Sequence, residues 1–487
     1  MSMLKAKRST VSKMMNVRIS YLTLWCVSAI WLFSQDFSYG QKVLTIQEVF
    51  AKVRAHHPLI TQAMMQNDFA AAEILKAKGN FDPSISTTIN QKNFDSKEYY
   101  SLLHGELNLP TWIGADIKTG YELNRGVFLS PENSTPGNGL FYGGISMPIG
   151  QGLLIDERRA AVQSSRIMQD FASARQIDLT NEVLYQAAST YWEWFRAYNV
   201  RQIFRTSLDN AMERYQAVRF NAASGDRPAI DTTEAKIQIQ NISLGLNQAE
   251  TEYKVMSRIF SGLFWGDNNI HTGLNPDEMP NDLEKEIREN ALDAMMIEVN
   301  DFTSNHPYLE QLRQKIHQLE VERKLKRDKL KPKINLQYNP LIEPIGSNIF
   351  TNYNINNYKW GMEFKMPLFL RKERGDIKLA ELKLKETNLI LQNKTVELFN
   401  KYNAYITEWQ ATLDQIEIFD EAVRLYEQML IAERRLFNVG ESSLFLVNSR
   451  EQSFINAKIK LTELVAKNKL AYYSIFYFAG QLDALQR

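Results

Sequence analysis

Two periodicities of hydrophobic and polar positions divide this chain into strand-like and helix-like segments. Alternation with a period of two predicts strands at 84–89, 99–109, 114–124, 140–149, 333–341 and 358–367. Long stretches without glycine or proline predict helices at 153–224, 376–439 and 441–479, with 229–261 as the return arm of the first. At ~1.5 Å per residue, the first would be roughly 100 Å long. Apolar positions in the last two stretches recur at steps of three, four and seven residues, which is typical of antiparallel coiled-coil neighbours.

The segment 114–124 shows the strand pattern most clearly. Its odd-numbered positions include Ile117, Tyr121 and Leu123, whereas its even-numbered positions include Asp116 and Glu122. A wall between lipid and water needs one apolar and one polar face of this kind. The helices are too long and too polar to form one globular core, so we expect them to pack against further copies of the chain.

The same order of elements occurs twice. Pro58 and Pro83 have the spacing of Pro307 and Pro332, and each pair leads into strands, a Met-Pro pair and a long helical stretch that is broken once. A repeat of this length indicates a duplicated architecture. We therefore predict a first repeat at 41–265, a linker at 266–282, a second repeat at 283–487, and helical-hairpin tips near 221–228 and 438–443.

The N-terminus has the three parts of a secretory signal. Basic residues from Lys5 to Arg18 precede an apolar core at 19–33, and small residues at Ser38 and Gly40 predict cleavage before Gln41. An N-terminal anchor helix is the alternative. The one cysteine of the chain, Cys26, lies in the apolar core without the small residues of a lipoprotein signal before it. A disulfide framework and a lipid anchor are therefore not expected.

Composition and charge narrow the function further. The 487 residues carry a net charge of +1, with both signs spread along the chain, so nucleic acid is not an expected partner. His56, His57 and His306 stand beside prolines that open helices, which explains them without a metal. No catalytic constellation or phosphate-binding loop is present, so we predict no enzyme activity, catalytic residue, metal or cofactor.

These features together resemble the TolC-like outer-membrane efflux protein family over essentially the whole mature chain. The two hairpin turns, 219–225 and 436–444, are similar to the paired periplasmic tips of that family. The resemblance implies a mixed α and β fold built from two repeats, in which a trimer shares one outer-membrane β-barrel continuous with a long periplasmic α-helical barrel. It implies an exit duct of a tripartite efflux or type I secretion system, located in the outer membrane with its helices in the periplasm. The implied partners are two further copies of the chain, a periplasmic adaptor (membrane fusion) protein, an inner-membrane pump of RND or ABC type, and outer-membrane lipid.

The resemblance also assigns roles to residues of the tips. It implies adaptor contacts at Asn221, Gly225, Asn438, Val439, Gly440 and Leu444. The glycines also have a structural explanation, because glycine supplies the left-handed backbone that ends a helix. Asp231 matches the aspartate of the family's closed entrance, and with Glu234 it forms either an acidic ring in the lumen or a solvated helix N-terminus.

The chain departs from the family at the other entrance positions. Phe437 stands where the family's tyrosine would be and Ser442 where its arginine would be, so the usual ionic bridge cannot form. Leu446 and Ser449 replace two aspartates of a cation-selective ring. An apolar constriction at Leu446 that closes by dewetting is our hypothesis for this gate.

Several alternatives stay open at this point. The family pattern has four strands per protomer, whereas this chain supplies six, so either the barrel is wider or one hairpin folds back outside it. The aromatic residues of the strands form either an interfacial girdle or core contacts, and they are Trp112, Tyr121, Tyr142, Tyr358 and Trp360. Drug or metal efflux competes with protein or polysaccharide export. A periplasmic coiled-coil scaffold without channel activity is the alternative from another class.

Overall fold

The computed structural model describes residues 42–288, 299–344 and 353–486. The predicted signal peptide, 1–40, lies outside the described residues. The chain separates into two compact units, of which the first comprises Met1–Leu44 and Asn275–Pro280 and the second comprises the remainder. In the described part of the first unit, β1 (Lys42–Val43) pairs in parallel with β6 (Glu278–Met279).

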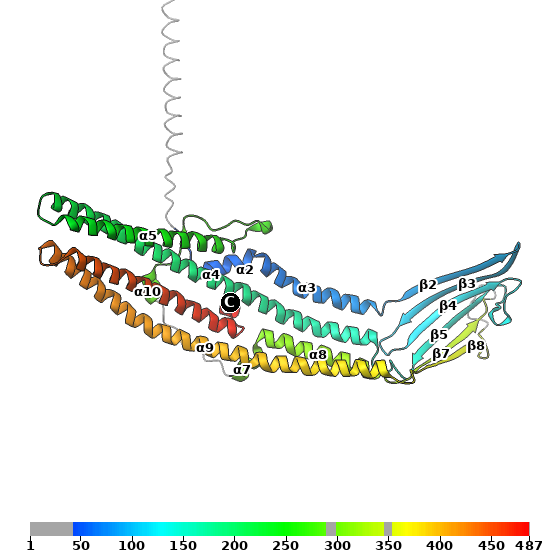
Figure 1. The fold of residues 1–487 in the computed structure, drawn as a ribbon. Coiled ribbons are helices and arrows are strands. Elements are labelled where there is room, and N and C mark those ends of the chain that lie inside the picture. Colours follow the sequence, from blue (N-terminus) through cyan, green and yellow to red (C-terminus); the bar gives the residue numbers. More distant parts are fainter. Residues whose placement is uncertain (1–41, 289–298, 345–352, 487) are drawn as a thin grey trace, which may run out of the picture. The chain divides into compact units, whose positions relative to one another are not determined.

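The second unit contains two long helical hairpins and the shorter helices that pack beside them (Figure 1). The first hairpin is α4 (Glu157–Ala223) with α5 (Ala229–Ser261), and the second is α9 (Arg371–Asn438) with α10 (Leu444–Phe478). The shorter helices are α2 (Ile46–His56), α3 (Pro58–Gly79), α6 (Leu283–Arg288), α7 (Val299–Asn305) and α8 (Pro307–Asp328). Residues 289–298, between α6 and α7, lie outside the described residues.

The duplication predicted from the prolines is visible in the helix starts. Helices α3 and α8 both have 22 residues and both begin with proline. In each, the preceding histidine is the N-cap: His57 Nδ1 accepts from the Leu59 amide at 3.3 Å, and His306 Nδ1 accepts from the Tyr308 amide at 3.1 Å. The caps satisfy one of the unpaired amides of each helix N-terminus. The histidines therefore act at helix entry, as the sequence indicated.

Aromatic packing holds each long hairpin together. In the first, Trp194 of α4 stacks on Phe260 of α5 with ring centroids 4.8 Å apart, and both are fully buried. In the second, Tyr402 and Trp409 of α9 pack with Ile475 of α10 in one buried cluster. Such pairs add specific geometry to the burial of apolar area. In the described part of the chain, no helix is both long enough and apolar enough to cross a membrane.

Six strands form one antiparallel sheet, in the order β2-β3-β4-β5-β7-β8. Their bounds are β2 (Ser84–Phe94), β3 (Lys97–Pro110), β4 (Asp116–Arg125), β5 (Leu140–Pro148), β7 (Lys333–Ile342) and β8 (Tyr358–Lys365). All six predicted strands are thus present. Strand β4 pairs with β3 on one side and β5 on the other, so the extra hairpin of the first repeat lies within the sheet and does not fold back outside it.

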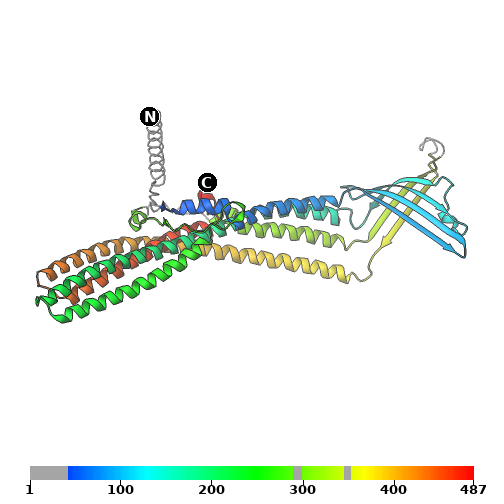
Figure 2. The same ribbon diagram turned by 90° about the horizontal axis from the view of Figure 1, so that it is seen from above.

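The sheet is curved and adjoins the ends of α3, α4, α8 and α9 that lie away from the hairpin turns (Figure 1). Contacts between consecutive helices give the order α3, α4, α8, α9, and the strands connected to these helices follow the same order in the sheet. Figure 2 shows the hairpins side by side at the opposite end, where α4 contacts α10. The second unit therefore has a sheet end and an end formed by the two hairpin turns, which we call the tips.

Candidate functional site

The two faces of the sheet differ sharply in polarity. The registers place Ile89, Leu103, Leu123 and Phe141 on one face, and this face continues into β7 and β8. Its large exposed hydrophobic residues are Ile85, Ile89, Ile117, Ile145, Leu336, Tyr338, Tyr358, Trp360, Met362 and Phe364. An exposed apolar surface of this extent marks a contact with membrane or protein. We call it the apolar face of the sheet.

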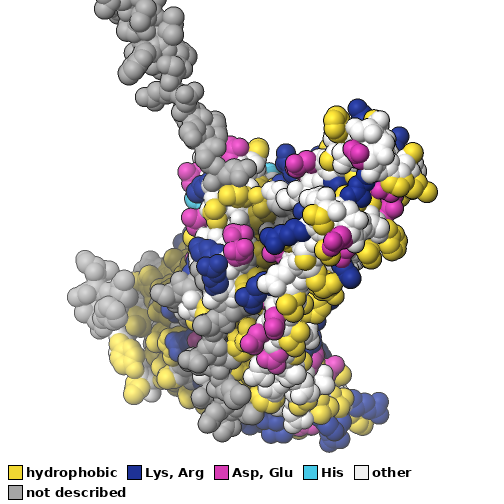
Figure 3. All heavy atoms as spheres, turned by 90° about the vertical axis from the view of Figure 1, so that its left-hand side faces the viewer, with side chains coloured by type: hydrophobic (Ala, Val, Ile, Leu, Met, Phe, Trp, Pro, Cys, Tyr) yellow, Lys and Arg dark blue, Asp and Glu magenta, His cyan; other side chains and the backbone are white. Residues whose placement is uncertain are grey.

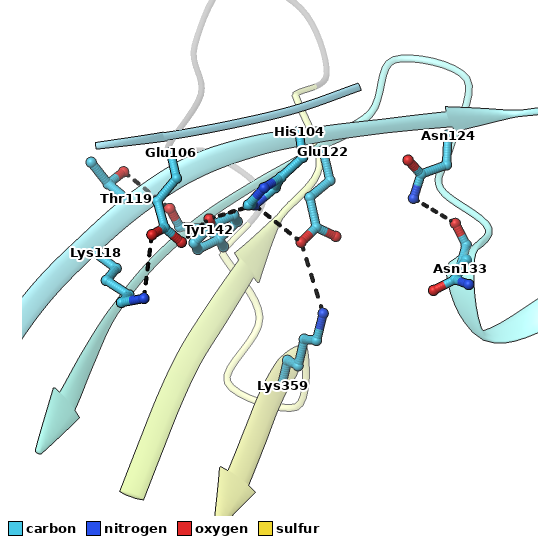
Figure 4. A network of polar contacts seen from close by, with 9 residues as sticks. All are labelled: His104, Glu106, Lys118, Thr119, Glu122, Asn124, Asn133, Tyr142 and Lys359. Carbon is cyan, nitrogen blue, oxygen red and sulfur yellow. Dashed lines mark hydrogen bonds and ion pairs between the residues drawn. The ribbon is translucent and has the colours of Figure 1, made fainter. Parts of the chain in front are cut away.

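The opposite face carries a hydrogen-bonded network, and we call it the polar face (Figure 4). The Tyr142 hydroxyl donates to Glu106 Oε2 at 2.8 Å, and His104 Nε2 lies 2.8 Å from the same hydroxyl and 3.7 Å from Glu122 Oε1. A Cβ at Gly120 would lie 2.5 Å from the Tyr142 hydroxyl, so only glycine leaves room for this ring. The network comes from β3, β4 and β5, which are consecutive in the sequence and adjacent in the sheet.

The network corrects one aromatic assignment. Tyr142 is buried on the polar face and does not belong to an interfacial girdle, because its hydroxyl has polar partners there. Tyr121, Tyr358 and Trp360 lie on the apolar face. Trp112 lies in the turn between β3 and β4, stacked on Phe81. Even-numbered residues of β4 and β5 share the polar face, and Tyr142 is one of them. The same alternation, applied to each aromatic residue of the strands, would have shown that Tyr142 lies on the other face from Tyr121.

The tips lie at the other end of the second unit, and Figure 3 shows hydrophobic side chains interspersed with charged ones there. Both turns use glycine with positive φ, +82° at Gly225 and +87° at Gly440, which is the left-handed backbone that ends a helix. The Ser443 side chain caps α10 by accepting from the Leu446 amide. Neither glycine has an atom within 4 Å of where a Cβ would be. Backbone conformation therefore explains both glycines, and it leaves their surface open.

An apolar cluster beneath the turns joins the two hairpins. It contains buried residues from all four long helices, and these are Val218, Ala235, Leu430, Phe437, Leu444 and Val447. Leu444, predicted to touch an adaptor, is 1% exposed, so its side chain supports the tip from inside. Val439 is 72% exposed and Asn438 and Gly440 are also exposed, while Asn221 is half-buried.

Polar contacts join the tips beside this cluster. The Arg227 guanidinium lies over the Phe437 ring, 3.7 Å from its centroid, and donates to the Phe437 carbonyl. Asn448 of α10 donates to Glu234 Oε1 of α5 at 3.2 Å. Each contact connects the first hairpin to the second. Phe437 replaces the family's tyrosine and cannot form the family's ionic bridge. It instead takes part in a cation–π contact.

Glu451 forms the most buried ionic contact at this end. Its side chain is 3% exposed. Arg214 of α4 donates hydrogen bonds to both carboxylate oxygens, with Nη1 at 3.0 Å from Oε1. Arg434 of α9 donates a further hydrogen bond to Oε1 at 2.9 Å. One carboxylate of α10 therefore binds two other long helices. A buried charge of this kind is stable only while it is paired and hydrogen-bonded.

The remaining predicted residues occupy separate positions. Asp231 is in the first turn of α5, and Ser442 donates to Glu433. Leu446 is 39% exposed in the first turn of α10, and Ser449 is exposed one turn further. The structure thus brings Phe437 and Leu444 together in the cluster, and it leaves Leu446 and Ser449 on the surface of the protomer.

Sequence reasoning missed Arg214, Arg227, Arg434 and Glu451. Glu451 carried a usable signal, because it lies four residues after Val447 in the apolar stripe of α10, where a charge needs a partner. Its partner Arg214 is 237 residues away, and no sequence pattern points to it.

Comparison with known protein families gives a match. The family model described as outer membrane efflux protein matches residues 299–476, which cover β7, β8, the second hairpin and α8. Over these residues the match confirms the predicted resemblance to the outer membrane efflux protein family. The match supports the predicted outer-membrane location. No curated protein matches the chain in sequence.

Solved structures extend the likeness of fold to the rest of the chain. The CmeC outer membrane channel of Campylobacter jejuni is similar with a TM-score of 0.64 and 14% identity, over 90% of this chain and 86% of that one. The outer membrane protein VceC of Vibrio cholerae gives 0.63 and 14%, over 89% and 96%. The MtrE outer membrane channel of Neisseria gonorrhoeae, in its open state, gives 0.64 and 11%, over 89% and 88%. The mixed α and β fold predicted from the sequence is confirmed.

Proposed function

We propose that this protein is the passive exit duct of a tripartite system, which receives substrates from an inner-membrane pump of RND or ABC type through a periplasmic adaptor. The observation that carries the proposal is the sheet, whose apolar face fits lipid and whose polar face fits a water-filled lumen. A conduit needs no covalent chemistry, because its selectivity and closure come from the lining of the channel.

We propose that three copies close the wall. Strands β2 and β8 are the edges of the sheet, and an open edge is a template for pairing with another chain. With six strands alternating in direction, β2 of one copy runs antiparallel to β8 of the next, so the ladder continues without a parallel seam. A head-to-tail contact of this kind generates a closed ring under three-fold symmetry.

The tips are proposed to dock on the adaptor and to hold the entrance. Their surface, at the exposed Gly225, Asn438, Val439 and Gly440 and the half-buried Asn221, is available for the adaptor. The gate is proposed at Asp231, Glu234, Phe437, Ser442, Leu446 and Ser449, with Leu446 forming the apolar constriction. Leu444 is part of the adaptor proposal, and it supports the docking surface by packing beneath the turn. The contacts of Arg227 and Glu451 join the two hairpins, and we propose that they hold the entrance closed.

Conductance in planar lipid bilayers tests the conduit. Purified protein should give discrete current steps, and the double variant Arg227→Ala, Glu451→Gln, which lacks two contacts between the hairpins, should give larger or longer openings. The second sample matters because a closed entrance keeps the wild-type current small. Silent bilayers with both proteins, each folded by circular dichroism, would contradict a channel and favour a scaffold.

A further inference from the structure

A cavity of about 590 Å³ lies between α4 and α8, beside the turn that joins β3 to β4. Its volume falls within the roughly 300–1,000 Å³ range of small-molecule sites. Its lining includes two large exposed apolar residues, four basic residues and one buried carboxylate, and these are Trp112, Leu154, Arg159, Lys324, Arg327, Lys331 and Asp328. The cavity therefore combines an apolar side with four basic residues, and none of them has a part in the tips or in the polar network of the sheet.

The basic residues differ in how far their charge is already neutralised. Arg327 pairs with Glu381 at 3.1 Å, Lys331 pairs with Asp328 at 2.5 Å, and Arg159 pairs with Asp156 at 3.3 Å. Within the part of the chain that the structure describes, Lys324 is exposed and has no acidic partner. The cavity thus presents one free cation together with three held in place by carboxylates. That arrangement favours an anion.

The apolar side of the cavity marks the boundary of the membrane. Trp112 is 52% exposed and stacks on Phe81, with ring centroids 4.3 Å apart. Leu154 is exposed beside it, in the segment between β5 and α4. Both residues lie where the strands end and the helices begin. Tryptophan is enriched at this level of a bilayer, because its ring is apolar and its N–H reaches the headgroups.

The cavity is separate from the polar side of the wall. A second cavity of about 290 Å³ is lined by Arg158 and Lys333, of which Arg158 pairs with Asp116 at 2.9 Å. The registers place Asp116 and Lys333 on the polar face. Ile155 and Asp328 line both cavities, but the larger one adds Arg159 and Gln163 on α4 and Lys324 and Arg327 on α8, which face away from Arg158 and Lys333. It opens on a different side of the α4–α8 seam from the polar face.

We propose that this cavity binds the headgroup of an anionic phospholipid, with the phosphate at Lys324 and Arg327 and the upper acyl chains along Leu154 and Trp112. Basic pockets between helices at a membrane surface recognise such headgroups through charge and through the apolar rim beside it. The α4–α8 seam lies in the middle of the helix order, whereas α3 and α9 are its ends. A neighbouring copy that joins at the sheet edges therefore leaves the cavity open to lipid.

Native mass spectrometry of the full chain, purified in mild detergent and stripped of lipid, tests this site. Added phosphatidylglycerol should be retained by the wild-type protein, and phosphatidylcholine should be retained several-fold less. Lys324→Gln should lower phosphatidylglycerol retention several-fold, and Lys324→Gln combined with Trp112→Ala should lower it further. The matched control is Lys315→Gln, an exposed lysine on α8 outside the cavity, which should retain lipid as the wild type does.

Three results would overturn the proposal. Equal retention by Lys324→Gln and Lys315→Gln would place any bound lipid elsewhere. Equal retention of phosphatidylcholine would show that the apolar surface alone holds lipid. Displacement of phosphatidylglycerol by millimolar inorganic phosphate would identify a site for free anions. The inference depends on the outer-membrane location and not on conduction, so a protein that is silent in bilayers yet binds phosphatidylglycerol in this way would uphold it.

Discussion

At the scale of single residues, Glu451 has the largest predicted effect on the tips. Glu451→Gln removes the charge that pairs Arg214 and Arg434 but keeps the shape of the side chain. Breaking a buried pair in this way costs about 3–5 kcal/mol, because the partner charges stay behind without compensation. We expect faster amide hydrogen exchange at both tips, measured by mass spectrometry. Glu427→Gln, at an exposed position of α9, is the control, and equal exchange in the two variants would show that Glu451 does not hold the hairpins.

Leu446 tests the proposed gate. The side chain is part-exposed in the first turn of α10, where an apolar ring from three copies would expel water from a narrow entrance. Leu446→Asp replaces that ring with charge and should raise single-channel conductance in planar bilayers. Phe445→Asp, at the adjacent and more exposed position, is the control for added charge alone. Unchanged conductance in Leu446→Asp would exclude an apolar gate at this position.

His306 makes stability depend on pH. Burial lowers its pKa from 6.5 to about 4, so the folded helix cap stays neutral. In the unfolded chain this histidine gains a proton below about pH 6.5, whereas in the folded chain it does so only below about pH 4. The difference favours unfolding, by roughly 3 kcal/mol once the pH has fallen to about 4. Stability should therefore fall as the pH drops through this window.

The variant His306→Asn keeps an N-cap acceptor and removes the titration. Its loss of thermal stability between pH 7 and pH 4.5, followed by circular dichroism in detergent, should be smaller than that of the wild type. His317→Asn, at an exposed position of the same helix, should behave as the wild type does. A wild-type loss that His306→Asn leaves unchanged would show that this cap is not the pH-sensitive group.

At the scale of elements, the two edge strands carry the proposal of a closed wall. Cys26 is the one cysteine of the sequence and lies in the predicted signal peptide, so engineered thiols should be the only ones in the mature chain. Thr87→Cys in the middle of β2, combined in turn with Trp360→Cys, Met362→Cys or Phe364→Cys in β8, should give covalent dimers and trimers on oxidation. Thr119→Cys in the interior strand β4, with the same partners, should stay monomeric on a denaturing gel. Monomers in every combination would contradict pairing between β2 and β8.

The elements themselves follow from the sequence more fully than their contacts do. Alternation at 114–124 predicted a two-faced strand, and β4 has those two faces. The same alternation did not decide whether four or six strands of each protomer form the wall. It shows that a strand has two faces, but it does not show which strand lies beside it. The stripe of α10 predicted helix packing, yet the pairing of Glu451 with Arg214 depends on two hairpins meeting at their tips. Local periodicity therefore fixes element type, and tertiary pairing decides the site.

At the scale of the whole molecule, the two repeats contribute unequally to one sheet. Each repeat supplies one long hairpin and one helix capped by histidine, while the first supplies four strands and the second two. The sheet thus has six strands where the family pattern has four. Because barrel diameter grows with strand number, three copies should enclose a wider lumen than a four-stranded pattern would. The repeat boundaries at 265 and 283 stay a prediction.

The most direct test of a trimeric conduit is the mass and form of the particle extracted from outer membranes in mild detergent. Light scattering corrected for detergent should give three chains per particle, and negative-stain electron microscopy should show a hollow rod roughly 100 Å long or longer, as the length of α4 requires. A detergent-independent, solid particle of one or two chains would contradict the account, and the duplicated hairpins would then belong to a scaffold.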